Sequence, residues 1–135
     1  MITDELHAIL AGDATLTGLL SSYEGEPAIF TVDPALGDAT LPYIVTASST
    51  VVTPYDTKTT LGREVWRDIR CYAEANGSAV TVEAIAERVR QLLHRQELTS
   101  ADYETIWSEC DGPINADDGE AYGRIVTLKI TIQEI

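Results

Sequence analysis

The sequence predicts an α+β fold: a mostly antiparallel, twisted sheet of about four or five strands, with a long helix on one face and a short N-terminal helix pair. Two observations support this prediction. Residues 62–74 and 124–135 alternate apolar and polar side chains, as half-buried strands do. Residues 78–98 instead place apolar side chains at helical spacing, beginning with Val82 and Ile85.

Two short helices are predicted at the start of the chain. Leu6 and Leu10 follow helical spacing, and carboxylates occupy the first turn, where the helix dipole favours them. Gly12 ends this helix, and Asp13 can cap a second helix that contains Leu16. Together the two helices form a small lid with a leucine-rich underside.

Two apolar runs predict strands in the first half of the chain. Residues 28–32 are rich in strand-forming side chains, and residues 42–49 begin with a proline, which the first position of a strand tolerates. Residues 50–61 are polar and rich in threonine. This segment is either a mobile loop or the tip of a long hairpin.

The predicted strand at residues 62–74 has one irregular face. Its apolar side, which includes Val65, is interrupted by Arg67. Such an interruption is typical of a sheet edge, a partner surface or a snorkelling side chain. Trp66 and Tyr72 lie on the opposite, nominally polar side, which indicates that this side is covered as well.

The rest of the chain continues the same pattern. The long helix is expected to end near residue 98. Residues 103–110 alternate as a strand, residues 111–123 form a loop rich in glycine and aspartate, and residues 124–135 form the clearest half-buried strand. One domain, residues 1–135, accounts for this order of elements, because no repeat or linker interrupts it.

The charge balance limits the possible functions. The chain has 22 acidic and 9 basic residues, a formal net charge of −13. This balance disfavours affinity for nucleic acid or anionic membranes, because such binding needs clustered lysine and arginine. The charge either keeps the protein soluble or provides a wall past which DNA slides without sticking. No apolar run could span a membrane and no secretory signal is visible, so we expect a cytoplasmic product.

No group of residues predicts catalysis or a cofactor. His7 and His94 each lie on a predicted helix without a partner at metal-ligand spacing. Cys71 and Cys110 lie in predicted strands and are expected to be reduced packing residues. Because no nucleophile, base and orienting group can be named together, we expect a protein that is not an enzyme and needs no cofactor.

The most site-like cluster is acidic and lies in the predicted loop at residues 111–123. Its members are Asp111, Asn115, Asp117, Asp118 and Glu120. Oxygen ligands of this kind bind Ca²⁺ or Mg²⁺, but the spacing does not fit an EF-hand loop, because Val126 stands where the bidentate glutamate belongs. No metal is therefore assigned. The loop is interpreted either as a solvated hairpin tip or as a tip that faces a partner or the path of DNA.

Five segments occur in an informative order: residues 6–20, 41–45, 64–72, 84–93 and 123–128. They are a broken opening helix, a proline-led strand, a charged strand with a tryptophan, a long helix and an arginine-led terminal strand. In this order the chain resembles a family of small tail-completion proteins, the tail terminator or head–tail joining proteins of long-tailed phages. The resemblance covers nearly the whole chain, and that family has no catalytic residues to transfer.

The resemblance implies a structural virion protein that assembles as a homohexameric ring. The ring would cap the tail tube and contact the tail tube protein on one side and the head–tail connector or stopper protein on the other. DNA would pass through its lumen without specific binding, and no membrane would be involved. The implied location is the tail or neck of the virion, after assembly in the host cytoplasm.

Several residues are candidates for contacts in such a ring. Trp66, Arg67 and Tyr72 are proposed because aromatic residues and arginine are enriched in interface cores. Tyr55 and Asp56 lie in a segment that can reach a neighbour. The acidic loop would face a partner or the lumen through Asp111, Asp117, Asp118 and Glu120.

Other functions stay open at this stage. The nearest alternative is a neck adaptor or stopper protein that faces the head. From a different class, the chain could be a small acidic module that binds a protein or ligand through the acidic loop. An acidic mimic of DNA fits less well, because the carboxylates are scattered along the sequence instead of being spaced like phosphates.

Overall fold

The computed structural model describes residues 3–31, 40–54, 56, 61–98, 101–117 and 121–134. The helices are α1 (Thr3–Ala11), α2 (Ala14–Thr17) and α3 (Val80–Leu93). The strands are β1 (Ser22–Tyr23), β2 (Glu26–Pro27), β3 (Ile29–Phe30), β4 (Tyr43–Pro54), β5 (Gly62–Glu74), β6 (Tyr103–Asn115) and β7 (Ala121–Glu134). The α+β prediction is confirmed. None of the helices that the structure describes is long and apolar enough to cross a membrane.

The main sheet has five strands in the order β3-β4-β5-β7-β6. The long strands pair antiparallel, whereas the short β3 lies parallel to β4. β5 is the central strand and pairs with β7 along its whole length, from Gly62 opposite Gln133 to Glu74 opposite Ala121. The separate two-stranded hairpin of β1 and β2 is a feature that the sequence pattern did not predict.

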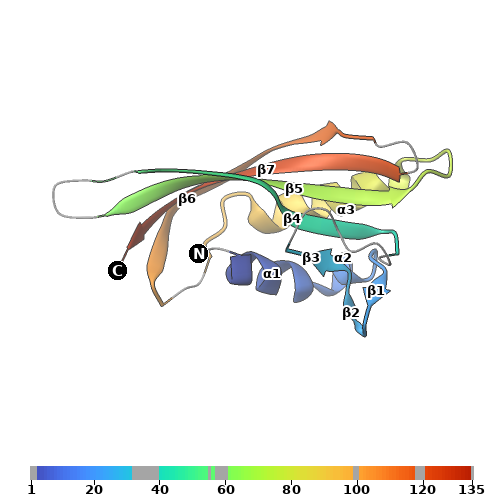
Figure 1. Ribbon diagram of the computed structural model, residues 1–135, viewed down its shortest axis with the longest axis horizontal. Helices are drawn as coiled ribbons and strands as arrows, with labels where there is room; N and C mark the ends of the chain where they lie inside the picture. The colour runs from blue at the N-terminus through green and yellow to red at the C-terminus, as the bar shows by residue number, and fades with distance from the viewer. Residues whose placement is uncertain are drawn as a thin grey trace.

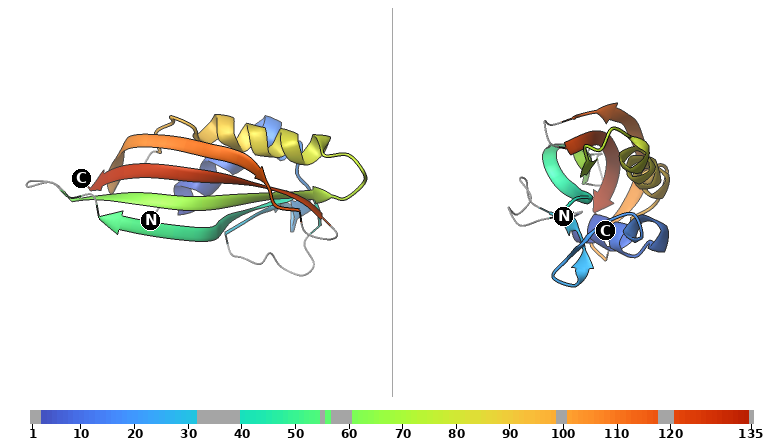
Figure 2. Two further views of the ribbon diagram at one scale, coloured as in Figure 1. Left: turned by 90° about the horizontal axis from the view of Figure 1, so that it is seen from above. Right: turned by 90° about the vertical axis from the view of Figure 1, so that its right-hand side faces the viewer.

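One face of the sheet is buried beneath the helices. The alternation predicted for β5 is present: Val65, Ile69 and Cys71 are almost fully buried, while the even-numbered side chains from Trp66 to Tyr72 are only half-buried. The helices divide this face between them, because α3 contacts β5, β6 and β7, whereas α1 contacts β3 and β4. Figures 1 and 2 show this layer of helices on one side of an elongated, twisted sheet.

A smaller cluster forms on the opposite face of the sheet, near β1 to β3. Phe30 lies between Tyr23 and Tyr43, with ring centroids 5.3 Å and 5.7 Å away. Tyr43 in turn lies 5.5 Å from Tyr72 of β5. The expectation of a covered second face is therefore confirmed at Tyr72, whereas Trp66 belongs to a more open part of that face and is half-buried.

The long helix ends earlier than predicted, at Leu93 and not near residue 98. His94 is already extended, and Arg95 has a positive φ of 56°. The chain leaves the helix here because the next residues run beside β6, where the Arg95 N–H donates to the Ser108 carbonyl at 3.0 Å. A tertiary contact of this kind is not visible as a sequence period.

Of the two interpretations of residues 50–61, the hairpin is closer to the structure. β4 continues to Pro54, five residues beyond the predicted end of that strand at residue 49. These additional residues pair with residues 63–67 in the first half of β5. The paired ends of these strands extend past the helices (Figures 1 and 2). The predicted strand at residues 28–32 is shorter than expected, since β3 contains only Ile29 and Phe30 and residue 32 lies outside the described residues.

The predicted loop at residues 111–123 is mostly strand. β6 runs on to Asn115, and β7 begins at Ala121. An irregular register between Asp111 and Ile114 accommodates Gly112, whose φ of +96° suits glycine. A side chain at Gly112 would also lie only 2.7 Å from the Ile125 carbonyl oxygen. The glycine that suggested a loop is thus a bulge within a long hairpin.

The buried face allows a first prediction. Ile69 is fully buried at the centre of the sheet, so Ile69→Ala should lower the free energy of unfolding by about 2–5 kcal/mol. Val80 is 72% exposed, so Val80→Ala should change it by less than about 0.5 kcal/mol. Urea unfolding followed by circular dichroism measures both. Equal effects of the two substitutions would contradict the assignment of the core.

Candidate functional site

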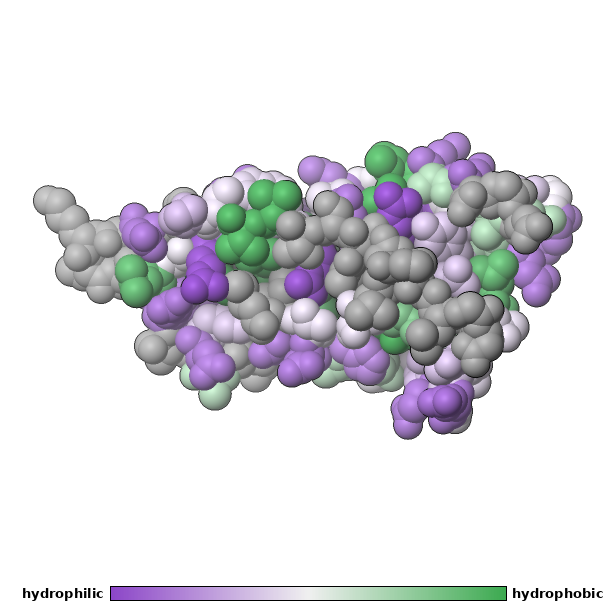
Figure 3. Space-filling model, viewed as in Figure 1, coloured by the Kyte–Doolittle hydropathy of each residue, from purple (hydrophilic) through white to green (hydrophobic). Residues whose placement is uncertain are grey.

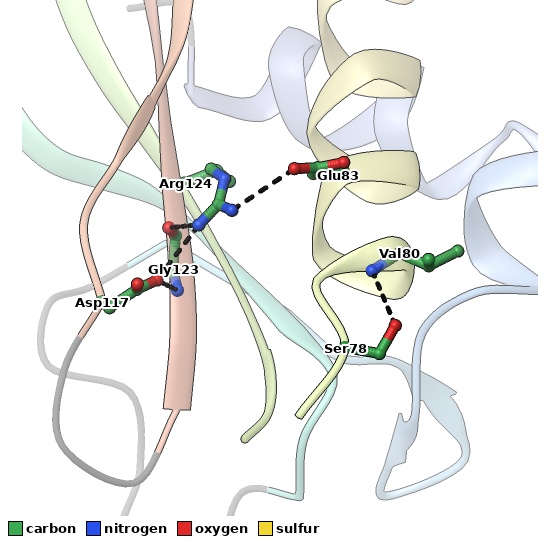
Figure 4. A network of polar contacts seen from close by, with 6 residues as sticks. All are labelled: Ser78, Val80, Glu83, Asp117, Gly123 and Arg124. Atoms are coloured by element: carbon green, nitrogen blue, oxygen red, sulfur yellow. Dashed lines mark hydrogen bonds and ion pairs between the residues drawn. The ribbon is translucent and has the colours of Figure 1, made fainter. Parts of the chain in front are cut away.

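One arginine holds the turn end of the β6–β7 hairpin. Arg124 of β7 is largely buried, and its Nη1 donates to Asp117 Oδ1 at 3.0 Å and to the Gly123 carbonyl at 2.8 Å. Its Nη2 lies 3.5 Å from Glu83 Oε1, in the first turn of α3. Figure 4 shows the guanidinium between these two carboxylates. The arginine therefore ties the hairpin to the start of α3.

This network accounts for part of the predicted acidic loop. Asp117 also accepts the Gly123 N–H at 3.1 Å, so its Oδ1 binds two residues at the start of β7. Asp111 is exposed on β6. Asp118 and Glu120 lie outside the described residues. Within the described ranges, no group of three histidine, cysteine, aspartate or glutamate side chains is arranged to hold a metal ion.

A second ion pair fastens the N-terminal helices to α3. Asp13 caps α2 by accepting the Leu16 N–H at 2.8 Å, as predicted. The same carboxylate accepts two hydrogen bonds from the Arg88 guanidinium, at 2.9 Å and 2.7 Å. The bonds from Arg88, followed by the bond from Leu16, lower the pKa of Asp13 to about 2. One side chain thus caps a helix and joins two helices.

Arg67, a candidate for partner contact, points into the protein. It is 8% exposed, and its Nη1 donates to Thr3 Oγ1 at 2.9 Å, in the first turn of α1. Arg67 Nε, Tyr103 Oη and Glu5 Oε2 are buried without a hydrogen-bond partner among the described residues. Burial, and then the nearby Glu5 carboxylate, raise the pKa of Tyr103 to about 12. This geometry favours a structural role for Arg67, in which its hydrogen bond to Thr3 holds the start of α1 against the sheet.

Trp66 lies on the open part of the second sheet face. Lys129 of β7 places its Nζ 5.6 Å from the Trp66 ring centroid and 4.0 Å from Glu109 Oε1. Val51, opposite Trp66 on β4, is 53% exposed. Figure 3 shows apolar residues in small groups among polar ones on one side of the molecule. An aliphatic side chain, an aromatic ring and a cation thus lie side by side on the adjacent strands β4, β5 and β7.

The other predicted contact residues are less informative. Tyr72 belongs to the aromatic cluster described above and accepts a hydrogen bond from Arg70 Nη1 at 3.4 Å. Asp56 is exposed and accepts the Gly62 N–H at 3.1 Å across the β4–β5 hairpin. Tyr55 lies outside the described residues.

The two sheet edges differ. At the β6 edge, the Ser108 carbonyl accepts the Arg95 N–H, and the Cys110 N–H donates to His94 Nδ1 at 3.0 Å. The chain segment after α3 therefore occupies the middle of this edge. At the opposite edge, β3 pairs with β4 only at Ile44 and Val45.

The cysteines are packing residues, as predicted. Both are buried with free thiols, and burial raises the pKa of Cys71 and of Cys110 to about 12. A thiol with such a pKa is a poor nucleophile and a poor metal ligand at neutral pH.

Sequence patterns missed three of these roles. Arg88 and Arg124 carry no local signal for their partners, because each pairs with a carboxylate on another element. His94 was expected on a helix, yet it follows the end of α3, and its Nδ1 accepts the N–H of Cys110 on a strand edge 16 residues away. The capping role of Asp13, in contrast to these three, could be predicted from the residues next to it.

Comparison with known proteins identifies the family. The family described as "Tail completion protein gp17" matches residues 4–133 of the chain. The chain belongs to this family. It is therefore a structural protein of a phage-type tail or neck, and the predicted resemblance is confirmed. Among curated proteins, none matches the sequence.

The fold recurs in a solved particle. A chain of the structure named "Virion of native gene transfer agent (GTA) particle" superposes with a TM-score of 0.78 and 17% sequence identity. The alignment covers 98% of this chain and 94% of that chain. At this identity the likeness shows a shared fold.

The Asp13–Arg88 pair predicts a pH dependence. The Asp13 pKa of about 2 lies below the value of about 3.9 in unfolded chains, so the ionised carboxylate stabilises the fold above that value. This contribution is lost as the pH falls from about 4 to about 2. Asp13→Asn keeps a cap acceptor but removes the charge. In urea unfolding, wild type should therefore be more stable than Asp13→Asn at pH 6, and the difference should shrink towards pH 2.5. A difference that stays constant across this range would contradict the prediction.

The Arg124 network predicts a second stability effect. Arg124→Ala removes charge-assisted bonds from a largely buried site and should lower the free energy of unfolding by about 1–3 kcal/mol. Among the described residues, the one ion pair of Arg90 is with Glu87 at 3.7 Å, and both side chains are at least a third exposed. Arg90→Ala is therefore the matched control, with an effect below about 0.5 kcal/mol. Thermal unfolding of both variants tests this. A loss in Arg124→Ala no larger than in the control would show that the tether contributes little.

Proposed function

We propose that this protein ends the phage tail. In this proposal it assembles as a homohexameric ring on the last layer of the tail tube, and DNA crosses the lumen on its way from the head. The outer surface of the ring then receives the head–tail connector or stopper protein. Membership in the tail completion family, over nearly the whole chain, is the observation that carries the proposal.

The shape of the protein supports a role in assembly. The described residues form an open sheet whose long β4–β5 hairpin extends past the helices (Figure 2). Val51, Val52 and Leu61 of this region are exposed apolar residues. Trp66, Tyr72 and Asp56 stay our candidates for contacts between chains, with Tyr55 and the acidic residues of the β6–β7 loop. Arg67 is proposed to act on α1 and only indirectly on the interface.

The charge supports a ring through which DNA moves. At −13, the chain repels the phosphate backbone, and weak binding favours passage over arrest. Asp111 on β6 is an exposed candidate for the lumen surface. The proposed activity is structural, with no chemical step, and the proposed place of assembly is the host cytoplasm.

The structure supports the two alternative functions to different degrees. A neck adaptor or stopper that faces the head shares the same requirements for a ring and stays the nearest alternative. A module that binds a ligand through the acidic loop is less favoured, because Asp117 is already engaged by Arg124 and Gly123.

Deletion of the gene from its phage or prophage tests the proposal. We expect tails that are overlong or ragged at the head-proximal end, separate from DNA-filled heads, because tail growth is not stopped and no joining surface forms. Electron microscopy of the particles gives the tail-length distribution and the fraction of joined particles. Expression of the wild-type chain from a plasmid is the control and should restore both.

Two other results would change the proposal. Tails of normal length beside unjoined or leaking heads would assign the protein to the head side of the neck. Normal infectious particles would exclude a required role in the virion and favour a binding module.

A further inference from the structure

We propose that the outer edge of β4, over residues 49–54, is a docking site for an extended strand of another tail protein. This inference rests on the proposed function, since it names how the chain attaches to the structure that it completes. The partner is defined by its chemistry: a backbone segment in β conformation, without charged side chains, which adds to the main sheet as a new strand.

The first observation is the length of the uncovered edge. β4 pairs on its outer side with β3 only at Ile44 and Val45, and it then continues to Pro54. After an irregular register, residues 49–54 pair regularly with residues 68–63 of β5. Among the described residues, no strand pairs with the other side of this run. Six residues of strand correspond to roughly 20 Å of backbone.

The second observation is which backbone groups point outward. The Ile44 N–H donates to the Ala28 carbonyl on the β3 side. The backbone N–H and C=O of Ile44, which lies opposite Cys71, therefore point away from β5. The backbone N–H and C=O of Cys71 then point towards β7. Because the register between β5 and β7 is uninterrupted, the backbone groups of all odd-numbered residues of β5 point towards β7 as well. The residues opposite them on β4 have their backbone groups pointing away from β5, towards the open edge. These residues are Thr50, Val52 and Pro54. Proline at the third position is consistent, because an edge strand tolerates it on the unpaired side.

The third observation is that this edge has little protection apart from the irregular register between Val45 and Ser49 and the terminal Pro54. Natural sheets usually protect exposed edges with charged side chains, bulges, proline or covering segments. The twelve residues of β4 contain no charged side chain, although charged residues make up 23% of the sequence. β6, at the other margin, has Glu104, Glu109 and Asp111, two irregular registers and the covering segment at His94 and Arg95.

The side chains beside the edge indicate the kind of strand that fits. Val51 is 53% exposed on one face of the sheet, and Val52 is 44% exposed on the other. An added strand would therefore have an aliphatic neighbour on each face. β-Branched or other apolar side chains on both faces of the partner strand would bury these valines, whereas a charged side chain would lose solvation there.

Pairing with a second copy of the chain explains this edge less well. Two β4 edges that paired with each other would form a closed twofold pair, which does not extend into a ring. The β6 edge of a neighbouring copy has its middle occupied by His94 and Arg95 of that copy. A β4–β6 contact would be interrupted at Ser108 and Cys110, and among the described residues this leaves no uninterrupted run of six residues on β6. We therefore assign the occupant to a different polypeptide.

The test uses tails isolated from particles made without this protein as the binding probe. Wild-type protein is added to these tails, and hydrogen–deuterium exchange is measured for the peptide that covers residues 46–54. We expect slower exchange of its amides on binding, because the outward N–H groups of Thr50 and Val52 gain carbonyl partners. The peptide that covers residues 103–115 of β6 is the internal reference and should change less.

A pair of variants tests the same edge by affinity. Val52→Pro removes one outward donor and leaves the β4–β5 hydrogen bonds in place, so it should bind tails at least about fivefold more weakly, as the loss of one or two backbone hydrogen bonds implies. Val52→Thr keeps both the N–H and the branched side chain and should bind as wild type does. Circular dichroism checks the fold of each variant, and the exchange experiment decides the question if Val52→Pro does not fold.

Each remaining outcome overturns the inference in a distinct way. Wild-type protein that binds tails without slower exchange in residues 46–54 would remove the docking site and leave the proposed function intact. Wild-type protein that does not bind these tails would remove both. Slower exchange in residues 46–54 of the protein alone, rising with concentration together with a dimer mass, would make a second copy the occupant.

Discussion

The fold depends on the pairing of β5 with both of its neighbours. β5 forms an unbroken ladder with β7 and a second ladder with β4, so most of its backbone donors and acceptors are satisfied on both sides. A central strand with alternating side chains then has one face that must be covered. The helices α1 and α3 cover it together, and the ion pair between Asp13 and Arg88 keeps the N-terminal lid in register with α3.

The same constraint gives the two margins of the sheet different properties. Because β5 is paired on both sides, the unpaired backbone lies at the margins of the sheet. These are β6 on one side and, on the other, the short β3 and the part of β4 that β3 does not cover. At β6 the chain returns on itself, with His94 and Arg95 bonded to the strand. At β4 the last described contact of this kind is at Thr46, whose hydroxyl donates to the Phe30 carbonyl of β3 at 3.3 Å. A protein that completes a larger assembly needs at least one surface that is incomplete by itself, and an open strand edge has this property.

Local signals were sufficient where each residue acts within its own element. The alternation in β7 placed Val126, Leu128 and Ile130 correctly in the core, and Asp13 was identified as a cap from its position before Leu16. These signals failed where an interaction joins distant segments. Arg67 interrupts a buried face, and the sequence left a sheet edge, a partner surface and a snorkelling side chain open as explanations. It gave no sign that the guanidinium contacts Thr3, which lies 64 residues away.

The sequence by itself determined the α+β class, the buried face of β5 and β7 and the long helix, because each depends on side-chain periodicity within a few residues. It also indicated the tail-completion family through the order of these elements. Tertiary structure alone decided where α3 ends, how far the β6–β7 hairpin extends and which edge of the sheet stays open. These features depend on backbone hydrogen bonds between segments distant in sequence, such as the bond from Arg95 to Ser108. Every residue except proline carries the same backbone donor and acceptor, so no side-chain pattern shows which of them will pair.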